Sequence, residues 1–253
     1  MDANALARMA GKEAVPLAIV EKDFALSVIL RAIAGSGLRD ALVFKGGTAI
    51  KKAYFPKARF SEDLDFTVVE SDAGAVENAV LGLFGGFKDS GIIIVGIERE
   101  RSPAGLRMAL KFTGPLSHPQ RIRLDFSLRE TVSAPPNKAK IIDRYGLGDC
   151  WMMTLCIEEL LAEKLRAVSR RNAPRDLYDI WFLLNNCVNV DVRLVERKLG
   201  IYNEKFDVGA VKARADSLKA QWKADLQQFV QQVPSFEAVE QEVFERLHKE
   251  FPP

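Results

Sequence analysis

The hydrophobic pattern of this 253-residue chain changes near residue 150. Before that point, segments with the period of a strand alternate with segments that have the period of a helix. In 105–113 and 121–129 every second residue is apolar, which predicts two strands with one buried face each. After that point, helical spacing prevails. The pattern predicts an α+β fold, with a mixed β-sheet and helices in a domain over 1–150 and a mostly helical domain over 151–253.

Turn residues and apolar runs place the remaining elements. Pro16 and Gly35 bracket a first helix, and Pro56 ends a short helix that begins near Thr48. We expect further strands at 41–44, 63–69 and 91–98. We expect further helices at 73–88, 154–171, 174–186, about 191–200, 208–232 and 235–250.

Charge and composition exclude several classes of protein. The chain has 36 Lys and Arg against 34 Asp and Glu, a formal net charge of +2, which excludes a polycation that binds nucleic acid by charge alone. No apolar run approaches the roughly 18 residues of a membrane helix, and charges interrupt the N-terminal segment where a signal peptide would be apolar. The three cysteines have neither metal-ligand spacing nor an even number. We expect a cytoplasmic protein that does not bind membranes.

Asp63 and Asp65 carry the strongest chemical signal. Residues two apart on a strand point to the same side, so the two carboxylates share one face of 63–69. A pair of this kind faces either solvent or a cation, and Mg²⁺ commonly binds one or two carboxylates together with substrate phosphates. A plain solvent-facing strand end is the alternative.

Two further features favour a site. Asp125 lies on the polar face of the predicted strand 121–129, where it adds a third carboxylate if that strand lies near 63–69 in the sheet. The segment Lys45-Gly46-Gly47-Thr48 follows a strand and precedes a helix. Glycines let the backbone approach a phosphate closely, and helix N-termini attract anions. A simple turn is the alternative for the glycines alone.

The order of these motifs resembles the nucleotidyltransferase superfamily. In finer detail the chain resembles the AbiEii/AbiGii toxin family of nucleotidyltransferases, through five segments spread over residues 16–187. These segments are VEKDF at 20–24, FKGGTAI at 44–50, RFSEDLDF at 59–66, EELLAEKLRAV at 158–168 and RDLYDIW at 175–181.

The resemblance implies a nucleotidyltransferase-like fold and the transfer of a nucleoside monophosphate from a nucleoside triphosphate to an acceptor. Asp63 and Asp65 would hold Mg²⁺, and Asp125 would bind metal or act as a base towards the attacking hydroxyl. The triphosphate would be bound by residues of the glycine turn and by neighbours that line the same pocket: Lys45, Gly46, Gly47, Thr48, Arg59 and Ser61. For Arg59 and Ser61 a simple turn position remains an alternative.

Three residues of the second half complete the candidate site. Lys164 falls within the apolar stripe of its predicted helix, so it must extend to solvent, pair with an acid or bind an anion. The resemblance implies that it binds the triphosphate or the leaving pyrophosphate. Asp176 and Asp179 share a helix face. The resemblance places them at the mouth of the site, whereas a solvated helix start is the alternative.

Basic residues gather in two stretches without acids, Lys45 to Arg59 and Lys164 to Arg175. Both adjoin candidate site residues, and we expect them to serve the triphosphate, an RNA backbone or both. Solvated helix faces are the alternative.

Three functions follow from these observations. The first is a toxin that transfers nucleotides from an NTP to RNA, most plausibly the tRNA 3′ end, and thereby inhibits translation, with a cognate antitoxin as a further partner. The second keeps the reaction but transfers to a protein or a small molecule. The third is a nucleotide-binding module without catalysis.

Overall fold

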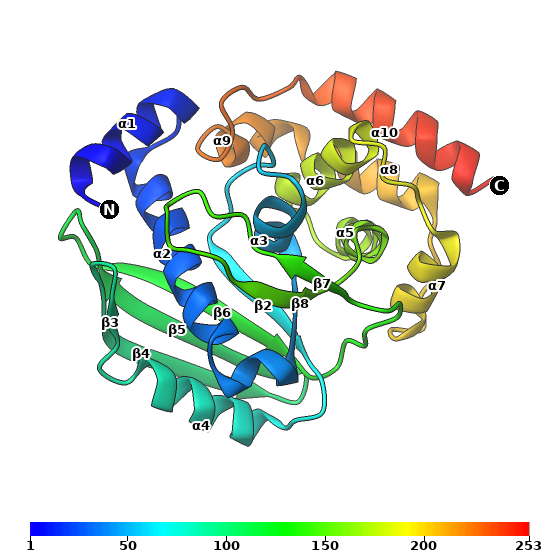
Figure 1. Ribbon diagram of the computed structural model, residues 1–253. Coiled ribbons are helices and arrows are strands. Elements are labelled where there is room, and N and C mark those ends of the chain that lie inside the picture. The colour runs from blue at the N-terminus through cyan, green and yellow to red at the C-terminus, as the bar shows by residue number, and fades with distance from the viewer. Residues whose placement is uncertain (253) are drawn as a thin grey trace. The chain divides into compact units, whose positions relative to one another are not determined.

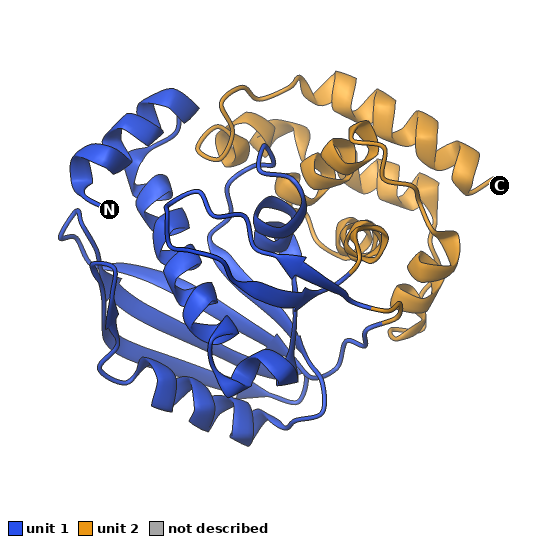
Figure 2. Cartoon of the chain, viewed as in Figure 1, with its two compact units in different colours: residues 1–132, 136–155 blue, residues 133–135, 156–253 orange. Residues whose placement is uncertain are grey.

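The computed structural model describes residues 1–252, which fall into two compact units (Figures 1 and 2). Unit 1 comprises Met1–Val132 and Pro136–Leu155, and unit 2 comprises Ser133–Pro135 and Cys156–Pro253. Unit 1 contains the sheet, and unit 2 is built from helices. The predicted mixed α+β fold is therefore confirmed. Within residues 1–252, no helix combines the length and the apolar character that crossing a bilayer requires.

Unit 1 is organised around one eight-stranded sheet with the order β3-β4-β5-β6-β2-β1-β8-β7. The strands are β1 Leu42–Lys45, β2 Asp63–Val68, β3 Lys88–Asp89, β4 Ile92–Ser102, β5 Gly105–Thr113, β6 Gln120–Ser127, β7 Asn137–Lys140 and β8 Trp151–Thr154. At the centre, β2 runs antiparallel to β1 and parallel to β6. Strands from distant parts of the chain thus meet where the candidate carboxylates lie.

Alternation fixes which face of the sheet is buried. In β5 and β6 the predicted apolar stripes are buried, from Leu106 to Phe112 and from Ile122 to Phe126. Leu128 was expected on the same stripe but is exposed, because β6 ends at Ser127. Three buried phenylalanines connect neighbouring strands, with ring centroids 5.5 Å apart between Phe44 and Phe66 and again between Phe66 and Phe126. Their burial leaves the odd-numbered residues of β2 for the opposite face.

Four helices belong to unit 1: α1 Ala3–Glu13, α2 Leu17–Ala34, α3 Gly46–Ala49 and α4 Ala73–Phe84. The helix α2 packs on β2 and β6, and α4 packs on β4 and β5 (Figure 1). The sequence pattern did not predict α1. The short helix predicted from Thr48 begins at Gly46 and continues as a π-helical turn over Ile50–Tyr54.

The sequence pattern also did not predict the two strands at one end of the sheet. β7 has the polar sequence NKAK and lies at the sheet edge, so it lacks the apolar alternation of a buried strand. β8 includes Thr154, which was expected to start a helix; instead Thr154 pairs with Phe44, and the helix α5 begins at Ile157. Long-range pairing with β1 therefore decides this segment.

Unit 2 contains the helices α5 Ile157–Arg170, α6 Pro174–Asn185, α7 Val192–Gly200, α8 Val208–Asp216, α9 Trp222–Leu226 and α10 Phe236–Glu250. The amphipathic helix α5 packs against α6, α7 and α8. Lys198 of α7 is completely buried, and its Nζ lies 2.6 Å from Glu159 and 3.0 Å from Glu163 of α5. Glu159 and Glu163 of the EELLAEKL segment thus join two helices within unit 2.

The single helix predicted over 208–232 is wrong. The helical spacing of apolar residues does continue, and Val211, Leu218 and Trp222 are all buried. However, α8 ends at Asp216, where the Ser217 hydroxyl donates to the carbonyl of Arg214 at 2.7 Å. A serine hydroxyl that binds the preceding turn competes with helix continuation, and the chain proceeds through a 3₁₀ turn into α9.

Candidate active site

Asp63, Asp65 and Asp125 lie on one face of the central strands of unit 1. β2 and β6 are parallel, and Asp65 is the direct partner of Asp125 in their register. Paired residues on adjacent strands point to the same side, and Asp63 shares that side because it lies two residues before Asp65. The structure therefore brings together three carboxylates that are separated by up to 62 positions in the sequence.

Arginines from the same face hold two of these carboxylates. The guanidinium of Arg123 donates two hydrogen bonds to Asp63, 2.9 Å from Nε to Oδ1 and 2.8 Å from Nη2 to Oδ2. Nε of Arg107 donates to Oδ1 of Asp125 at 2.8 Å. The hydrogen bonds to Asp63 raise the pKa of Arg123 above its ordinary value. The hydrogen bond to Asp125 raises the pKa of Arg107 in the same way. Both pairs are partly exposed, so they contribute little to stability and can exchange for another cation.

The glycine turn lies directly beside Asp65. Gly46 has φ +77°, and a Cβ there would lie 2.0 Å from Oδ2 of Asp65. A Cβ on Gly47 would lie 3.0 Å from Nη2 of Arg59 and 3.2 Å from Oγ of Ser61. Only glycine permits the first approach, for both steric and conformational reasons. The predicted juxtaposition of the turn, Arg59, Ser61 and the carboxylates is thus present in unit 1.

Lys45 and Thr48 make contacts within the fold of unit 1 that the sequence did not indicate. The Thr48 hydroxyl donates to the backbone carbonyl of Asp63, so it fixes the start of β2. Lys45 is the register partner of Asp65, and its ammonium forms an ion pair with Glu130. The functional roles of both residues remain predictions.

The donor set fits a divalent cation. Within residues 1–252, no group of three or more His, Cys, Asp or Glu side chains is arranged to hold a metal ion by itself. Mg²⁺ usually takes one or two carboxylates and fills its shell with phosphate and water oxygens. A phosphate on the Gly46 turn would lie beside Oδ2 of Asp65, and two adjacent anions repel each other unless a cation lies between them. The site therefore suits a cation that arrives with a nucleotide.

Two lysines of the basic stretch from Lys45 to Arg59 are buried and are therefore not available to an RNA backbone. Lys51 and Lys52 are each 3 % exposed. Lys51 donates to the carbonyl of Ala58 at 2.6 Å, and Lys52 pairs with the buried Asp23 at 2.8 Å. Burial lowers the pKa of Lys51 to about 8. Glu21 and Asp23 of the VEKDF segment are likewise buried.

The predicted residues of unit 2 form their own buried cluster. Nζ of Lys164 on α5 lies 3.0 Å from Asp176 and 2.7 Å from Asp179, both on α6. Arg171 adds two hydrogen bonds to Asp176, at 2.6 and 3.0 Å. Burial alone would raise the pKa of Asp176, but Lys164 and Arg171 outweigh it and hold the pKa well below its ordinary value. Lys164 thus pairs with acids, one of the alternatives that its sequence position allowed.

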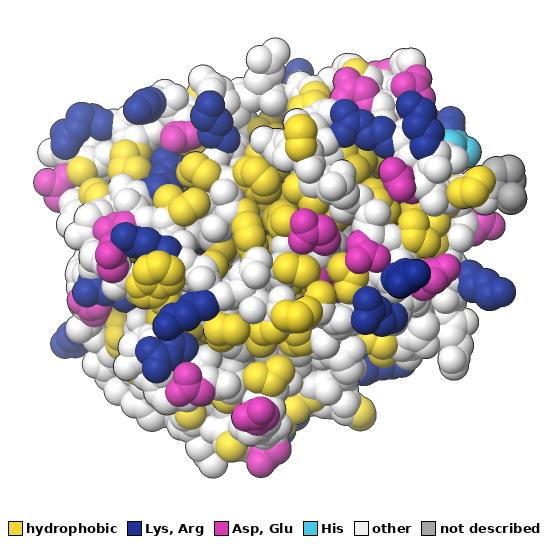
Figure 3. Space-filling view, turned by 45° about the vertical axis from the view of Figure 1, so that its right-hand side comes forward, with side chains coloured by type: hydrophobic (Ala, Val, Ile, Leu, Met, Phe, Trp, Pro, Cys, Tyr) yellow, Lys and Arg dark blue, Asp and Glu magenta, His cyan; other side chains and the backbone are white. Residues whose placement is uncertain are grey.

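The basic residues that follow Lys164 also have partners within unit 2. The guanidinium of Arg170 lies 4.1 Å from the ring centroid of Tyr202, and Arg175 lies 5.2 Å from that of Phe229. Lys and Arg side chains alternate with Asp and Glu side chains over the visible face of the molecule (Figure 3). Charges of both signs therefore occur on this face.

Sequence reasoning missed the partners of the carboxylates. Arg123 had a readable signal, because it lies two residues before Asp125 on the polar face of the same strand. Arg107 and Glu130 gave no such signal, since their pairing with Asp125 and Lys45 depends on the arrangement of unit 1. Charge partners across strands follow from register, which the sequence leaves open.

A glycine turn after a strand, an Asp-x-Asp pair on the next strand and a third carboxylate in register with it are the features expected of a nucleotidyltransferase. Comparison with protein families agrees. Residues 28–247 match the family described as the nucleotidyl transferase AbiEii toxin of type IV toxin–antitoxin systems, and the chain belongs to this family. Comparison with curated protein sequences gave no match.

A solved structure supports the same fold. The nucleotidyltransferase toxin MenT4 from Mycobacterium tuberculosis H37Rv superposes with a TM-score of 0.78. The match covers 97% of this chain and 88% of that chain, at 24% sequence identity. At this identity the likeness shows a shared fold, while the family match shows that the chain is a nucleotidyltransferase toxin.

Proposed function

We propose that this protein transfers a nucleoside monophosphate from an NTP to an RNA acceptor in a Mg²⁺-dependent reaction, with the tRNA 3′ end as the acceptor. Blocking that end would stop aminoacylation and so inhibit translation and growth. The observation that carries the proposal is the approach of Asp65 to the Gly46 turn, with Asp125 as its partner across the β2–β6 pair.

Different residues of unit 1 have different roles in the reaction. The backbone of Gly46 and Gly47 binds the triphosphate, and Arg59 and Ser61 line the turn. Asp63 and Asp65 are the ligands for Mg²⁺, which would neutralise charge on the phosphates. Asp125 serves as a further ligand or accepts the proton of the attacking hydroxyl. The oxygen of that hydroxyl bonds to the α-phosphorus as the bond to the β-phosphate breaks, and pyrophosphate leaves.

For unit 2 we propose that Lys164 binds the triphosphate or the departing pyrophosphate. Asp176 and Asp179 orient its ammonium group through the ion pairs described above. This role is testable apart from folding by Lys164→Arg, which keeps the positive charge but changes its shape and reach.

The direct test incubates the purified protein with each α-labelled NTP, total RNA and Mg²⁺. We expect label in RNase-sensitive material and its loss with EDTA or in Asp65→Asn. The matched control is Asp89→Asn, an exposed aspartate at the far edge of the same sheet, which should retain activity. Sequencing of tRNA 3′ ends then identifies the acceptor and the added nucleotide.

The other acceptors are outcomes of the same test. Label that resists RNase and remains with protein, or that stays in a small solute, would show a protein or small-molecule acceptor and contradict the RNA proposal. A wild-type protein that binds NTP but transfers nothing would show a binding module. Membership of a toxin–antitoxin family also implies a cognate antitoxin, which co-expression should reveal as relief from growth inhibition.

A further inference from the structure

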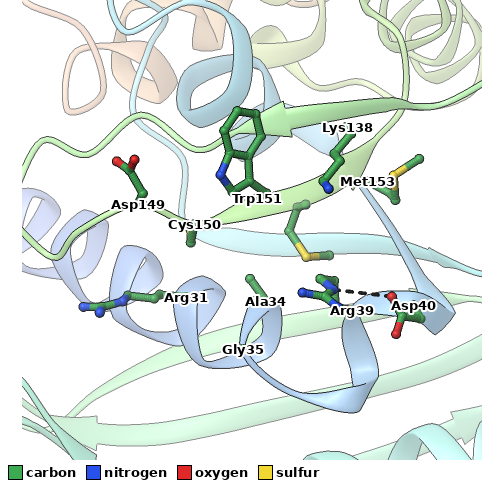
Figure 4. A pocket seen from close by; sticks show the side chains of 11 residues that line it. Arg31, Ala34, Gly35, Arg39, Asp40, Lys138, Asp149, Cys150, Trp151 and Met153 are labelled. Carbon is green, nitrogen blue, oxygen red and sulfur yellow. Dashed lines mark hydrogen bonds and ion pairs between the residues drawn. The ribbon is translucent and has the colours of Figure 1, made fainter.

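Unit 1 contains a pocket on the side of β8 that is remote from the catalytic carboxylates. It has a volume of about 470 Å³ and lies where α2 and the following turn approach β7 and β8 (Figure 4). Its charged lining comprises Arg31, Arg39, Asp40, Lys138 and Asp149. The pocket is not used by the reaction described above.

Positive charge is in excess around this pocket. Asp40 is paired with Arg39 at 3.4 Å, and Asp149 is paired with Lys140 at 2.8 Å. Arg31 and Lys138 have no acidic partner among residues 1–252. Two cations are thus left for an anion, and phosphate groups of a nucleic-acid backbone have the matching charge.

An exposed aromatic side chain borders the pocket. Trp151 is 45% exposed, and Figure 4 shows its indole pointing away from α2. In register, Trp151 is the partner of Lys140, and Met153 is the partner of Lys138. An exposed indole among cations is the arrangement that binds single-stranded nucleic acid, because bases stack on the ring while phosphates bind the cations.

The indole shares a sheet face with the catalytic carboxylates. Thr154 pairs in parallel with Phe44, and Phe44 pairs with Phe66, so these even-numbered residues share the buried face. Trp151 therefore lies on the opposite face, together with Asp65. The two are separated by two strand spacings across the sheet, about 10 Å, and by four residues along it, about 13 Å. The resulting distance of about 16 Å is the length of roughly five stacked nucleotides.

From this arrangement we infer that Trp151 and Lys138, which the β7–β8 register puts on one face of the sheet, form a docking subsite for an unpaired stretch of the RNA acceptor. A base roughly five nucleotides from the reactive end stacks on Trp151, and a flanking phosphate binds Lys138. This inference rests on the proposed function for its biological meaning, but it concerns RNA binding, which can be measured without transfer.

The test measures binding of a fluorescein-labelled 12-nucleotide single-stranded RNA to the full chain by anisotropy. Trp151→Ala should raise the Kd about tenfold, and Trp151→Phe should retain most of the affinity because the ring can still stack. Lys138→Ala should reduce the slope of log K against log salt by about 0.7, as expected for one lost phosphate contact on a single strand. Val95→Ala and Lys88→Ala, exposed positions near the opposite edge of the sheet, are the matched controls.

Transfer assays add a length criterion. Trp151→Ala should raise KM for the 12-nucleotide acceptor about tenfold and leave kcat, KM for the NTP and KM for a dinucleotide acceptor unchanged, because a dinucleotide cannot span 16 Å. An unchanged Kd in both Trp151→Ala and Lys138→Ala would overturn the inference. Displacement of the 12-mer by AMP at a similar concentration would also overturn it, in favour of a mononucleotide site. A wild type that binds the RNA but never extends it would count against the proposed function alone.

Discussion

The carboxylates of the two units differ in how their charge is balanced. In unit 1, the side chains of Asp63 and Asp125 are 23% and 34% exposed, and their arginine partners are about half exposed. In unit 2, Asp176 and Asp179 are 1% and 4% exposed, and Lys164 is 10% exposed. An exposed ion pair is weak and can exchange partners, whereas breaking a buried pair leaves a charge without compensation. The ion pairs of unit 1 can thus exchange for another cation, while unit 2 holds its ammonium group in place.

The largest expected effect concerns catalysis in unit 1. Asp65→Asn keeps the shape of the side chain but removes the charge beside the Gly46 turn. We expect kcat to fall about 10⁴-fold, equivalent to about 5 kcal/mol of transition-state stabilisation. Labelled-NTP transfer measures this, and urea unfolding should show little change in stability. Transfer within tenfold of the wild type would contradict the assignment of Asp65.

The next effect concerns stability in unit 2. Lys164→Ala leaves Asp179 buried without this cation, and we expect a loss of about 3–5 kcal/mol in the free energy of unfolding. The matched control is Lys219→Ala, which breaks an exposed pair with Glu237 and should cost less than about 1 kcal/mol. If both variants unfold at the same denaturant concentration, the contrast between buried and exposed pairs is wrong.

A buried cation in unit 1 should make stability depend on pH. An unfolded lysine holds its proton up to a pKa near 10.5, while folded Lys51 releases it at about 8. Between these values the unfolded state binds more protons, so the free energy of unfolding should rise with pH, by up to about 3 kcal/mol. Lys51→Met should reduce this rise in urea titrations at pH 8, 9 and 10. The exposed Lys57→Met serves as control and should retain the wild-type slope.

The smallest effect tests whether the arginine pairs can exchange. Arg123→Gln removes the cation that competes with metal for Asp63. We expect stability to change by less than about 1 kcal/mol and the apparent affinity for Mg²⁺ to rise severalfold in the presence of NTP. Calorimetric titration measures the affinity, with Arg121→Gln, the next outward residue of β6, as the comparison. Weaker metal binding in Arg123→Gln would show that the arginine supports the metal site.

Parts of the fold and site were predictable because they depend on local pattern. Alternation placed the buried faces of β5 and β6, and the spacing of Asp63 and Asp65 put both on one face. The edge strand β7 was missed because it carries no apolar pattern, and the break after Asp216 was missed because the apolar spacing continues across it. The burial of Lys51 and Lys52 within the basic stretch was not predicted, since composition does not reveal burial.

The sequence by itself determined the class of fold, the family and the set of candidate site residues. Only the tertiary structure decided that Asp65 is the partner of Asp125, that Asp63 is held by Arg123 and that Lys51 and Lys52 are buried. The physical reason is that strand register, ion pairing and burial arise from contacts between segments far apart in the chain. Local propensity and periodicity describe single elements and carry no information about which elements meet.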